Sequence, residues 1–449
     1  MSGARLTRLV AMSLTLGLAA WLVPPETLAQ GARPAQAPPS PVAGRILSLQ
    51  EAIDIALENQ PSIQARLGDY AAARQRVDQA FSGLLPQIGG SWNALRDQTA
   101  KVGETSATTG RTGPTITSWG TTTTAKVTLS QLLFDFGKTF AATDREKANA
   151  ESSKEDVEID RNDTVLLVKE SYFNLLFGKR LVVVNQEAVA RAELNLRSAK
   201  GFFEVGTRPK FDVTRAEVDL ANSQLTLIQA RNAVRLARVA LNTAMGISAT
   251  APTEVQDILT YEAFPVDESR LLAEALQRRP EYRQIKARVE AAEASVRQNF
   301  RNFFPDVTSN AWYGANRADM NEIWELGVTL NWSIFDGGNK IAKYKEAKAS
   351  LEAAQARVRV QELAIWKEVE QAYLNVIEGE ERIQAAKKAV ESAQENFRLA
   401  QGRFDAGVGT IIELTDAQLE LTQAQSREAN ALTDYRIAVS RLERSLGRR

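Results

Sequence analysis

The chain has 449 residues, and its 55 basic and 55 acidic side chains give a formal net charge of zero, so we expect no nucleic-acid partner. Histidine and cysteine are both absent, which excludes disulfides, thiolate or imidazole metal sites, and catalytic triads that need a histidine base. We therefore expect neither a metal site nor a cofactor.

The first 29 residues are predicted to be a signal peptide. Two arginines precede an apolar stretch over 9–23, which a pair of prolines ends. That stretch is too short for a transmembrane helix, and the small residues at 27–29 are typical of a cleavage site. The alternative is an uncleaved anchor. Residues 30–45 are rich in proline, and we expect them to form a disordered lead.

The rest of the chain is an internal duplication. Matching segments are 219 residues apart near the start of each copy and 201 residues apart further on, so 18 extra residues lie between Pro86 and Val127. We expect repeat 1 over 46–246, a linker over 247–267 and repeat 2 over 268–449. The matching pairs include Leu57 and Leu276, Pro61 and Pro280, Tyr172 and Tyr373, Phe203 and Phe404, and Gly206 and Gly407.

Each repeat is predicted to begin with two helices and to continue with two strands. Ser48 and Glu51 have the spacing of a capping box at the start of the first helix. Further on, the apolar residues change from helical spacing to alternate positions, which indicates strands. The strands are expected near 85–95, 123–134, 304–314 and 323–335, with hairpin loops at about 96–122 and 315–322.

One face of each predicted strand is apolar and the other is polar. Each strand has about ten residues, the length that a tilted strand needs to cross a bilayer. Aromatic residues lie near the strand ends, as they do in the interface belts of outer-membrane barrels. The alternative is a sheet of a soluble protein that packs its aromatic rings inward. The residues expected to face lipid are Ile88, Trp92, Val127, Leu129, Leu326, Val328, Leu330 and Trp332.

A very long helix is predicted after each hairpin, over 136–205 and 338–406, followed by return helices over 211–245 and 411–446. Apolar residues recur at every seventh position in both long helices, which predicts coiled-coil contacts with neighbouring helices. We therefore expect a mainly α-helical fold with a small transmembrane β part. The heptad residues are Val168, Leu175, Val182, Val189 and Leu196 in repeat 1, and Val369, Val376, Ile383, Val390 and Phe397 in repeat 2.

Four amphipathic strands are too few to close a barrel, because the smallest barrels formed by one bacterial chain have about eight. An open sheet in lipid would leave two unpaired edges, where each unmet backbone group costs several kcal/mol. Several chains are therefore expected to share one barrel. Geometry alone permits two, three or four copies.

This arrangement resembles the TolC family of bacterial outer-membrane efflux and secretion channels over nearly all of the chain after the predicted lead. The shared motifs are Leu49-x-Glu51-Ala52-Ile53 with Asn59-Gln60-Pro61, and the turns around Gly206 and Gly407. The resemblance implies a homotrimer in which four strands and four helices per chain form a 12-stranded barrel and a 12-helix periplasmic tunnel. It also implies a bacterial outer-membrane location that extends into the periplasm, contact with lipid, and two partners, a periplasmic adaptor protein and an inner-membrane transporter.

By the same resemblance, the turns between long and return helices narrow the tunnel with inward carboxylates. Asp416 and Glu413 match these positions in repeat 2. Asp212 matches one of them in repeat 1, where Arg215 replaces the other acid. Acidic rings in a narrow pore favour cations. The structural alternatives are a capping box of Thr410 with Glu413 and a helix-dipole role for Asp212.

Well-known family members hold this end closed with a tyrosine and an arginine of the second turn, whereas this chain has Phe404 and Gly409 there. We predict that Arg208, in the first turn, supplies a substitute link. The turn residues are also expected to contact the adaptor, although the glycines can equally serve as helix caps. These residues are Gly206, Thr207, Gly407, Val408 and Gly409.

We found no phosphate-binding loop and no convincing serine nucleophile motif in the sequence, so we expect a protein that is not an enzyme. We predict the outer-membrane channel of a tripartite efflux or type I secretion system, a passive exit duct gated at the periplasmic turns. The alternative is a soluble periplasmic coiled-coil scaffold or adaptor protein. Drugs, metal ions, metabolites and polypeptides all leave through similar ducts, because the pump selects the cargo.

Overall fold

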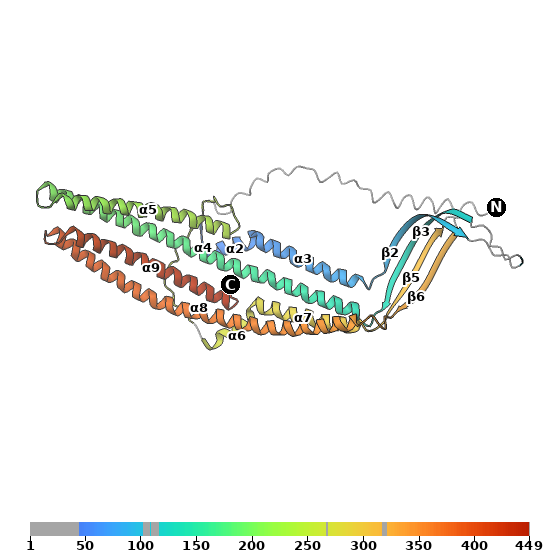
Figure 1. Cartoon of the computed structure of the whole chain (residues 1–449). Coiled ribbons are helices and arrows are strands. Elements are labelled where there is room, and N and C mark those ends of the chain that lie inside the picture. The colour runs from blue at the N-terminus through green and yellow to red at the C-terminus, as the bar shows by residue number, and fades with distance from the viewer. Residues whose placement is uncertain (1–44, 102–107, 109–115, 266–267, 317–320, 449) are drawn as a thin grey trace.

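The computed structural model describes residues 45–101, 108, 116–265, 268–316 and 321–448. The predicted signal peptide, and the predicted lead up to residue 44, lie outside these residues. The described part of the chain is elongated, with a curved sheet at one end of a long helical stem (Figure 1). Within it, no helix combines the length and the apolar character needed to cross a membrane.

The two repeats have the same order of long elements. Repeat 1 contains β1 (Ile46–Leu47), α2 (Leu49–Asn59), α3 (Pro61–Ser82), β2 (Gln87–Lys101), β3 (Ile116–Phe134), α4 (Lys138–Glu204) and α5 (Lys210–Ala244). After the linker strand β4 (Glu254–Val255), repeat 2 contains α6 (Glu268–Arg278), α7 (Pro280–Arg301), β5 (Asp306–Asn316), β6 (Asn321–Asn331), α8 (Asn339–Asp405) and α9 (Ile411–Ser445). The helices α4 and α8 each have 67 residues, and α5 and α9 each have 35. At 1.5 Å per residue, each long helix spans about 100 Å.

Local sequence explains where the helices begin. The capping box is confirmed at α2, because the amide of Ser48 donates to the carboxylate of Glu51 at 2.9 Å and the Ser48 hydroxyl accepts from the Glu51 amide. Pro61 and Pro280 occupy the first positions of α3 and α7, where a missing amide hydrogen removes no hydrogen bond. The second helix of each pair therefore starts in the same way.

The strands form an antiparallel sheet in the order β2-β3-β5-β6. The first hairpin is longer than predicted, because backbone pairing continues as far as Lys101 opposite Ile116. Segments 96–101 and 116–122 are therefore strand and not loop. The 18 extra residues lengthen the hairpin, so β2 and β3 have 15 and 19 residues while β5 and β6 have 11 each. Consecutive β-branched threonines in β3 favour this extension.

The last strand is shorter than predicted, and this removes Trp332 from the strand face. Asn331 pairs with Asp306, the first residue of β5, so the ladder ends there. The indole Nε1 of Trp332 instead donates a hydrogen bond to the carbonyl oxygen of Phe303, at 3.1 Å. Trp332 belongs to the joint between sheet and stem.

The helices pack side by side in a row that continues the order of the strands. Near the sheet the order is α3-α4-α7-α8, and further along the stem it is α5-α4-α9-α8 (Figure 1). Further along the stem, α5 occupies the position of α3 in the row, and α9 occupies the position of α7. The row therefore has two continuous edges, one formed by α3 and α5 and the other formed by α8. Predicted heptad residues such as Val168, Leu175 and Val376 are buried at these contacts.

The linker between the repeats packs on the middle of the stem. Its strand β4 pairs in parallel with β1. The hydroxyl of Tyr172 in α4 lies 3.1 Å from the carbonyl oxygen of Leu47 and 2.8 Å from that of Gln256. Burial raises the pKa of Tyr172 to about 12, so the phenol stays protonated and keeps its donor. This small sheet was not predicted, because two-residue strands leave no periodic pattern.

Candidate functional site at the helical turns

Both long helices end in the same left-handed cap. Gly206 has φ 76° and Gly407 has φ 77°, a region that favours glycine. The amide of Thr207 donates to the carbonyl of Phe202, and the amide of Val408 donates to the carbonyl of Arg403. These bonds define a Schellman motif. The predicted cap role of the two glycines is therefore confirmed, and the two turns share one backbone geometry.

Arg208 joins the first turn to the second. Its guanidinium donates a hydrogen bond to the carbonyl oxygen of Gly409 at 2.7 Å and lies 4.7 Å from the ring centroid of Phe404. The same group is 3.5 Å from the carboxylate of Asp212. The Arg208 side chain is only 14% exposed, which shields these contacts from water. The contact between the turns that we predicted for Arg208 is therefore present.

The residues of the second turn pack closely around the contact with Arg208. Phe404 is fully buried, and its ring meets that of Phe202 edge to face at 5.7 Å. A Cβ on Gly409 would lie 2.9 Å from the Cβ of Arg403, so glycine is needed for this packing. Gly409, predicted to contact an adaptor, is buried in the single chain and offers no exposed surface there. Its carbonyl oxygen accepts the hydrogen bond from Arg208 instead.

Asp212, predicted to line the tunnel, is buried in the single chain. Its side chain is 8% exposed and pairs with Arg208, four residues earlier in the chain. Asp212 lies in the first turn of α5, where a negative charge interacts favourably with the helix dipole. The negative charge of Asp212 is therefore paired with Arg208 within the single chain.

Asp416 and Glu413, in contrast, are exposed near the start of α9. The amide of Glu413 donates to the Thr410 hydroxyl at 3.2 Å, and its carboxylate lies 3.5 Å from Arg403. Half of the alternative capping box is therefore present. Asp416 has a different setting, in a groove of about 900 Å³ between α5 and α9 with α4 as its floor.

The groove contains two acidic and two basic side chains, because Arg427 of α9 also lines it. Asp219 of α5 lines it together with Asp416 of α9 and with Arg215. Burial raises the pKa of Asp219 above its ordinary value, Arg215 opposes this rise, and the neighbouring Asp416 carboxylate adds to it. Asp219 therefore binds a proton at a higher pH than an ordinary aspartate does. The charge of the groove therefore depends on pH.

The apolar face of the sheet is the second candidate surface. Apart from Trp332, the residues predicted to face lipid share this face and are 41–76% exposed in the single chain. Tyr313 pairs with Trp324 towards its outer end, and Phe134 and Phe304 lie at the end next to the stem. An exposed apolar face of this size indicates contact with a membrane or a partner.

The comparisons decide between these possibilities. A family model described as outer membrane efflux protein matches the chain twice, over residues 52–247 and 271–448. The chain belongs to the outer membrane efflux protein family. The two matches coincide with the two repeats, so each repeat is one copy of the family unit.

Known members of similar length support this assignment. The alkaline protease secretion protein AprF of Pseudomonas aeruginosa is 25% identical over 419 residues, which cover 88% of this chain and 83% of AprF. The outer membrane protein TolC of Escherichia coli is 25% identical over 410 residues, covering 87% and 80% of the two chains. The solved structure of the outer-membrane channel OprN has the same fold, with a TM-score of 0.75 at 20% identity and 89% coverage of each chain.

The resemblance to TolC is thus confirmed, and this efflux protein is an outer-membrane channel that extends into the periplasm. The alternative of a soluble scaffold or adaptor is set aside, because the family match covers both repeats.

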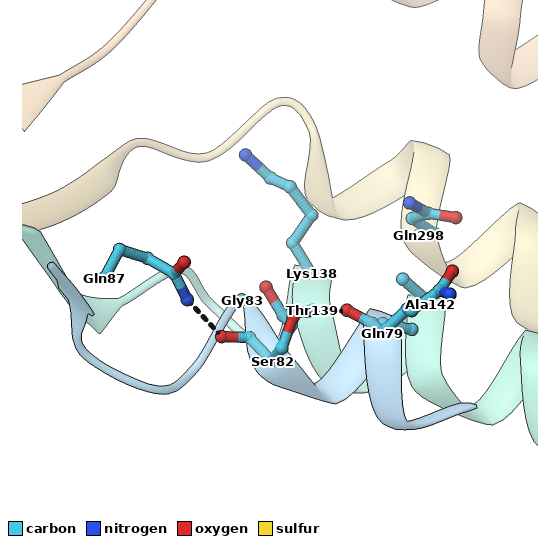
Figure 2. Close-up of a pocket in the computed structure, with 9 residues that line it drawn as sticks. Gln79, Ser82, Gly83, Gln87, Lys138, Thr139, Ala142 and Gln298 are labelled. Carbon is cyan, nitrogen blue, oxygen red and sulfur yellow. Dashed lines mark hydrogen bonds between the residues drawn. The ribbon is translucent and has the colours of Figure 1, made fainter. Parts of the chain in front are cut away.

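A polar hollow of about 400 Å³ marks the joint between sheet and stem of this efflux protein (Figure 2). The side chain of Gln87, at the start of β2, donates to the carbonyl of Ser82 at the end of α3. Lys138, the first residue of α4, reaches the carboxylate of Asp306 at the start of β5. These contacts fix the sheet to α3 and α4. Nowhere in the described residues do three or more acidic side chains gather in a way that could hold a metal ion.

Sequence analysis missed the polar contacts that join the repeats near the turns. Asn195 of α4 donates to the side chain of Gln418 of α9 at 2.6 Å, and Gln418 donates to the carbonyl of Ala188 at 3.2 Å. Both side chains are buried. The available signal was a polar residue directly before the heptad residue Leu196, but that signal does not identify the facing helix.

Proposed function

We propose that three copies of the chain form one continuous duct, a 12-stranded barrel followed by a 12-helix tunnel. In the described sheet, β2 and β6 are the edge strands, and unpaired edges in lipid cost several kcal/mol for each unmet backbone group. Pairing of β2 in one chain with β6 in the next removes every edge. Three copies, the number that the family resemblance implies, give a strand count within the range of outer-membrane barrels.

The stem supports the same interface. The edge of the helical row formed by α3 and α5 continues from β2, and the edge formed by α8 continues from β6. The edge helices α5 and α8 expose apolar side chains at intervals of seven or fourteen residues, and such stripes normally pack against another helix. These residues are Phe211, Val218 and Leu225 in α5, and Val360, Leu363, Leu374 and Ile377 in α8.

In this duct the apolar strand face contacts lipid and the polar face lines water. The tunnel carries solutes passively, and an inner-membrane transporter supplies the energy through a periplasmic adaptor protein. The exposed turn residues Gly206, Thr207, Gly407 and Val408 are the proposed adaptor contacts. A passive duct needs no catalytic group. The same duct serves tripartite efflux or type I secretion, because the transporter selects the cargo.

The observation that carries this proposal is the pair of unpaired edges that runs from sheet to stem. The test is gel electrophoresis of purified protein from outer membranes, with and without heating, followed by recording in planar bilayers. The expected result is a band of three chain masses that heating converts to one, and ionic current across the bilayer. A stable lone subunit that carries no current would contradict the proposal.

Asp416→Asn is expected to weaken the preference of the duct for cations. A unit charge about 4 Å from a passing cation contributes about 1 kcal/mol in water, so the permeability ratio should fall roughly fivefold. The reversal potential in a salt gradient measures this ratio. In the wild type, the preference should also decline as the pH falls, beginning above the usual aspartate range because the pKa of Asp219 is raised.

Glu254→Gln is the matched control, because Glu254 lies in the linker strand β4, pairs with Lys179 and does not line the groove. Its cation preference should equal that of the wild type. An unchanged reversal potential in Asp416→Asn would mean that another group selects the ions.

A further inference from the structure

Trp312 lies on the polar face of the sheet. In β5 it stands opposite Thr128 of β3 and Glu325 of β6. The next residue, Tyr313, stands opposite Trp324 and belongs to the apolar face. Because successive strand residues point to opposite faces, Trp312 faces the interior of the proposed barrel while Tyr313 and Trp324 face lipid.

Two charged side chains hold the Trp312 ring in place. Its indole Nε1 donates a hydrogen bond to the Glu325 carboxylate at 3.1 Å. The ammonium of Lys126 lies over the ring, 5.7 Å from its centroid. The first contact fixes the direction of the ring edge, and the second places a cation on one ring face. The ring is therefore oriented before any solute arrives.

Apart from Lys126 and Glu325, the neighbours of Trp312 on this face are small or polar. Its nearest neighbours along and across the strands include Asn310, Thr128, Gly314 and Gly327. A Cβ on Gly314 would lie 2.3 Å from the carbonyl oxygen of Ala125, so the sheet leaves no space for a larger residue there. The indole is partly exposed on the face of the sheet that lines the proposed lumen.

We propose that the three Trp312 rings of the assembled duct form a stacking site for flat aromatic solutes in the outer half of the barrel. This inference rests on the trimeric duct proposed above. Stacking between aromatic rings is modest in strength, and a pore requires binding that favours entry but still allows release. Lys126 competes with the solute for the ring face, which keeps the contact weak.

The test uses purified full-length trimers in planar bilayers, with ethidium as a flat aromatic cation and tetraethylammonium as a cation without rings. Ethidium added on the outer side should reduce the current through the wild type, and tetraethylammonium should not. Trp312→Leu should weaken the ethidium block roughly three- to tenfold. Lys126→Ala should strengthen it, because the ring face becomes free. A residue that only supports the sheet would give no such gain.

Trp324→Leu is the control, because Trp324 lies near Trp312 along the barrel but on the face towards lipid. Ethidium should block this variant as strongly as it blocks the wild type. Equal block of Trp312→Leu and wild type, or equal block by both cations, would overturn the inference. If Trp312→Leu does not assemble, the Lys126→Ala variant alone tests the inference. An ethidium block of Lys126→Ala that is equal to or weaker than that of the wild type would then overturn the inference. The current without ethidium reports on the duct itself, so a conducting channel that ethidium does not block refutes only the stacking site.

Discussion

Val328→Arg is expected to abolish assembly in the outer membrane, whereas Thr329→Arg, one residue further along β6, is expected to preserve it. Val328 is 67% exposed on the apolar face. Thr329 lies on the opposite face, paired with Thr308. An arginine on the lipid side near the middle of a barrel strand costs about 2–4 kcal/mol, and an arginine in the lumen does not meet lipid. Each of three chains would carry this cost.

Membrane fractionation and electrophoresis without heating measure the outcome. Val328→Arg should be missing from outer membranes and from the trimer band, while Thr329→Arg should be present in both and should conduct. The added lumenal charge should also lower the cation preference of Thr329→Arg. Normal assembly of both variants would show that this sheet is not embedded in lipid, and the reverse pattern would show that the two faces are exchanged.

Periodic patterns made most of this fold predictable from the sequence. The heptad spacing from Val168 to Leu196 extends over several turns of α4, and its counterpart in α8 has the same spacing. The predicted bounds, 136–205 and 338–406, differ from the observed helices by no more than two residues. Long amphipathic elements repeat the same signal many times, so local exceptions do not obscure it.

The extension of the first hairpin could not be predicted in this way. Segments 96–101 and 116–122 contain few apolar residues, so the alternation that marks the rest of the strands disappears. Strand pairing in this part depends on the partner backbone and on β-branched threonines and not on a buried face. A pattern of hydrophobic residues cannot mark a strand that is polar on both sides.

The turns show a similar limit. Comparison of the two repeats identified Arg208 as a substitute link, because the second turn lacks side-chain donors at Phe404 and Gly409. The spacing of four residues between Arg208 and Asp212 indicated that the two side chains can pair. It did not indicate that they are buried. Burial depends on the second turn, which follows almost 200 residues later in the chain and packs over the first. The sequence therefore indicated the arginine that contacts the second turn, but not the burial of its aspartate partner.

Arg208→Ala is expected to open the periplasmic end of the duct and to raise its conductance. The guanidinium is shared among the Gly409 carbonyl, the Phe404 ring and the Asp212 carboxylate. A hydrogen bond from a charged group contributes about 1.5–3 kcal/mol. Its loss should shift the balance between closed and open turns roughly tenfold to a hundredfold in each chain, since 1.4 kcal/mol corresponds to a factor of ten. Asp212 would also lose its partner, which adds to the effect.

Single-channel recording measures the change, and Arg403→Ala is the matched control at the same end of the stem. The Arg403 side chain is 59% exposed and pairs only loosely with Glu413, at 3.5 Å, and exposed pairs contribute little. Arg208→Lys should give an intermediate conductance, because lysine keeps the charge but cannot donate in several directions from a planar group. If Arg208→Ala conducts like the wild type, or if Arg403→Ala opens the duct equally, the contact between the turns does not hold the channel closed.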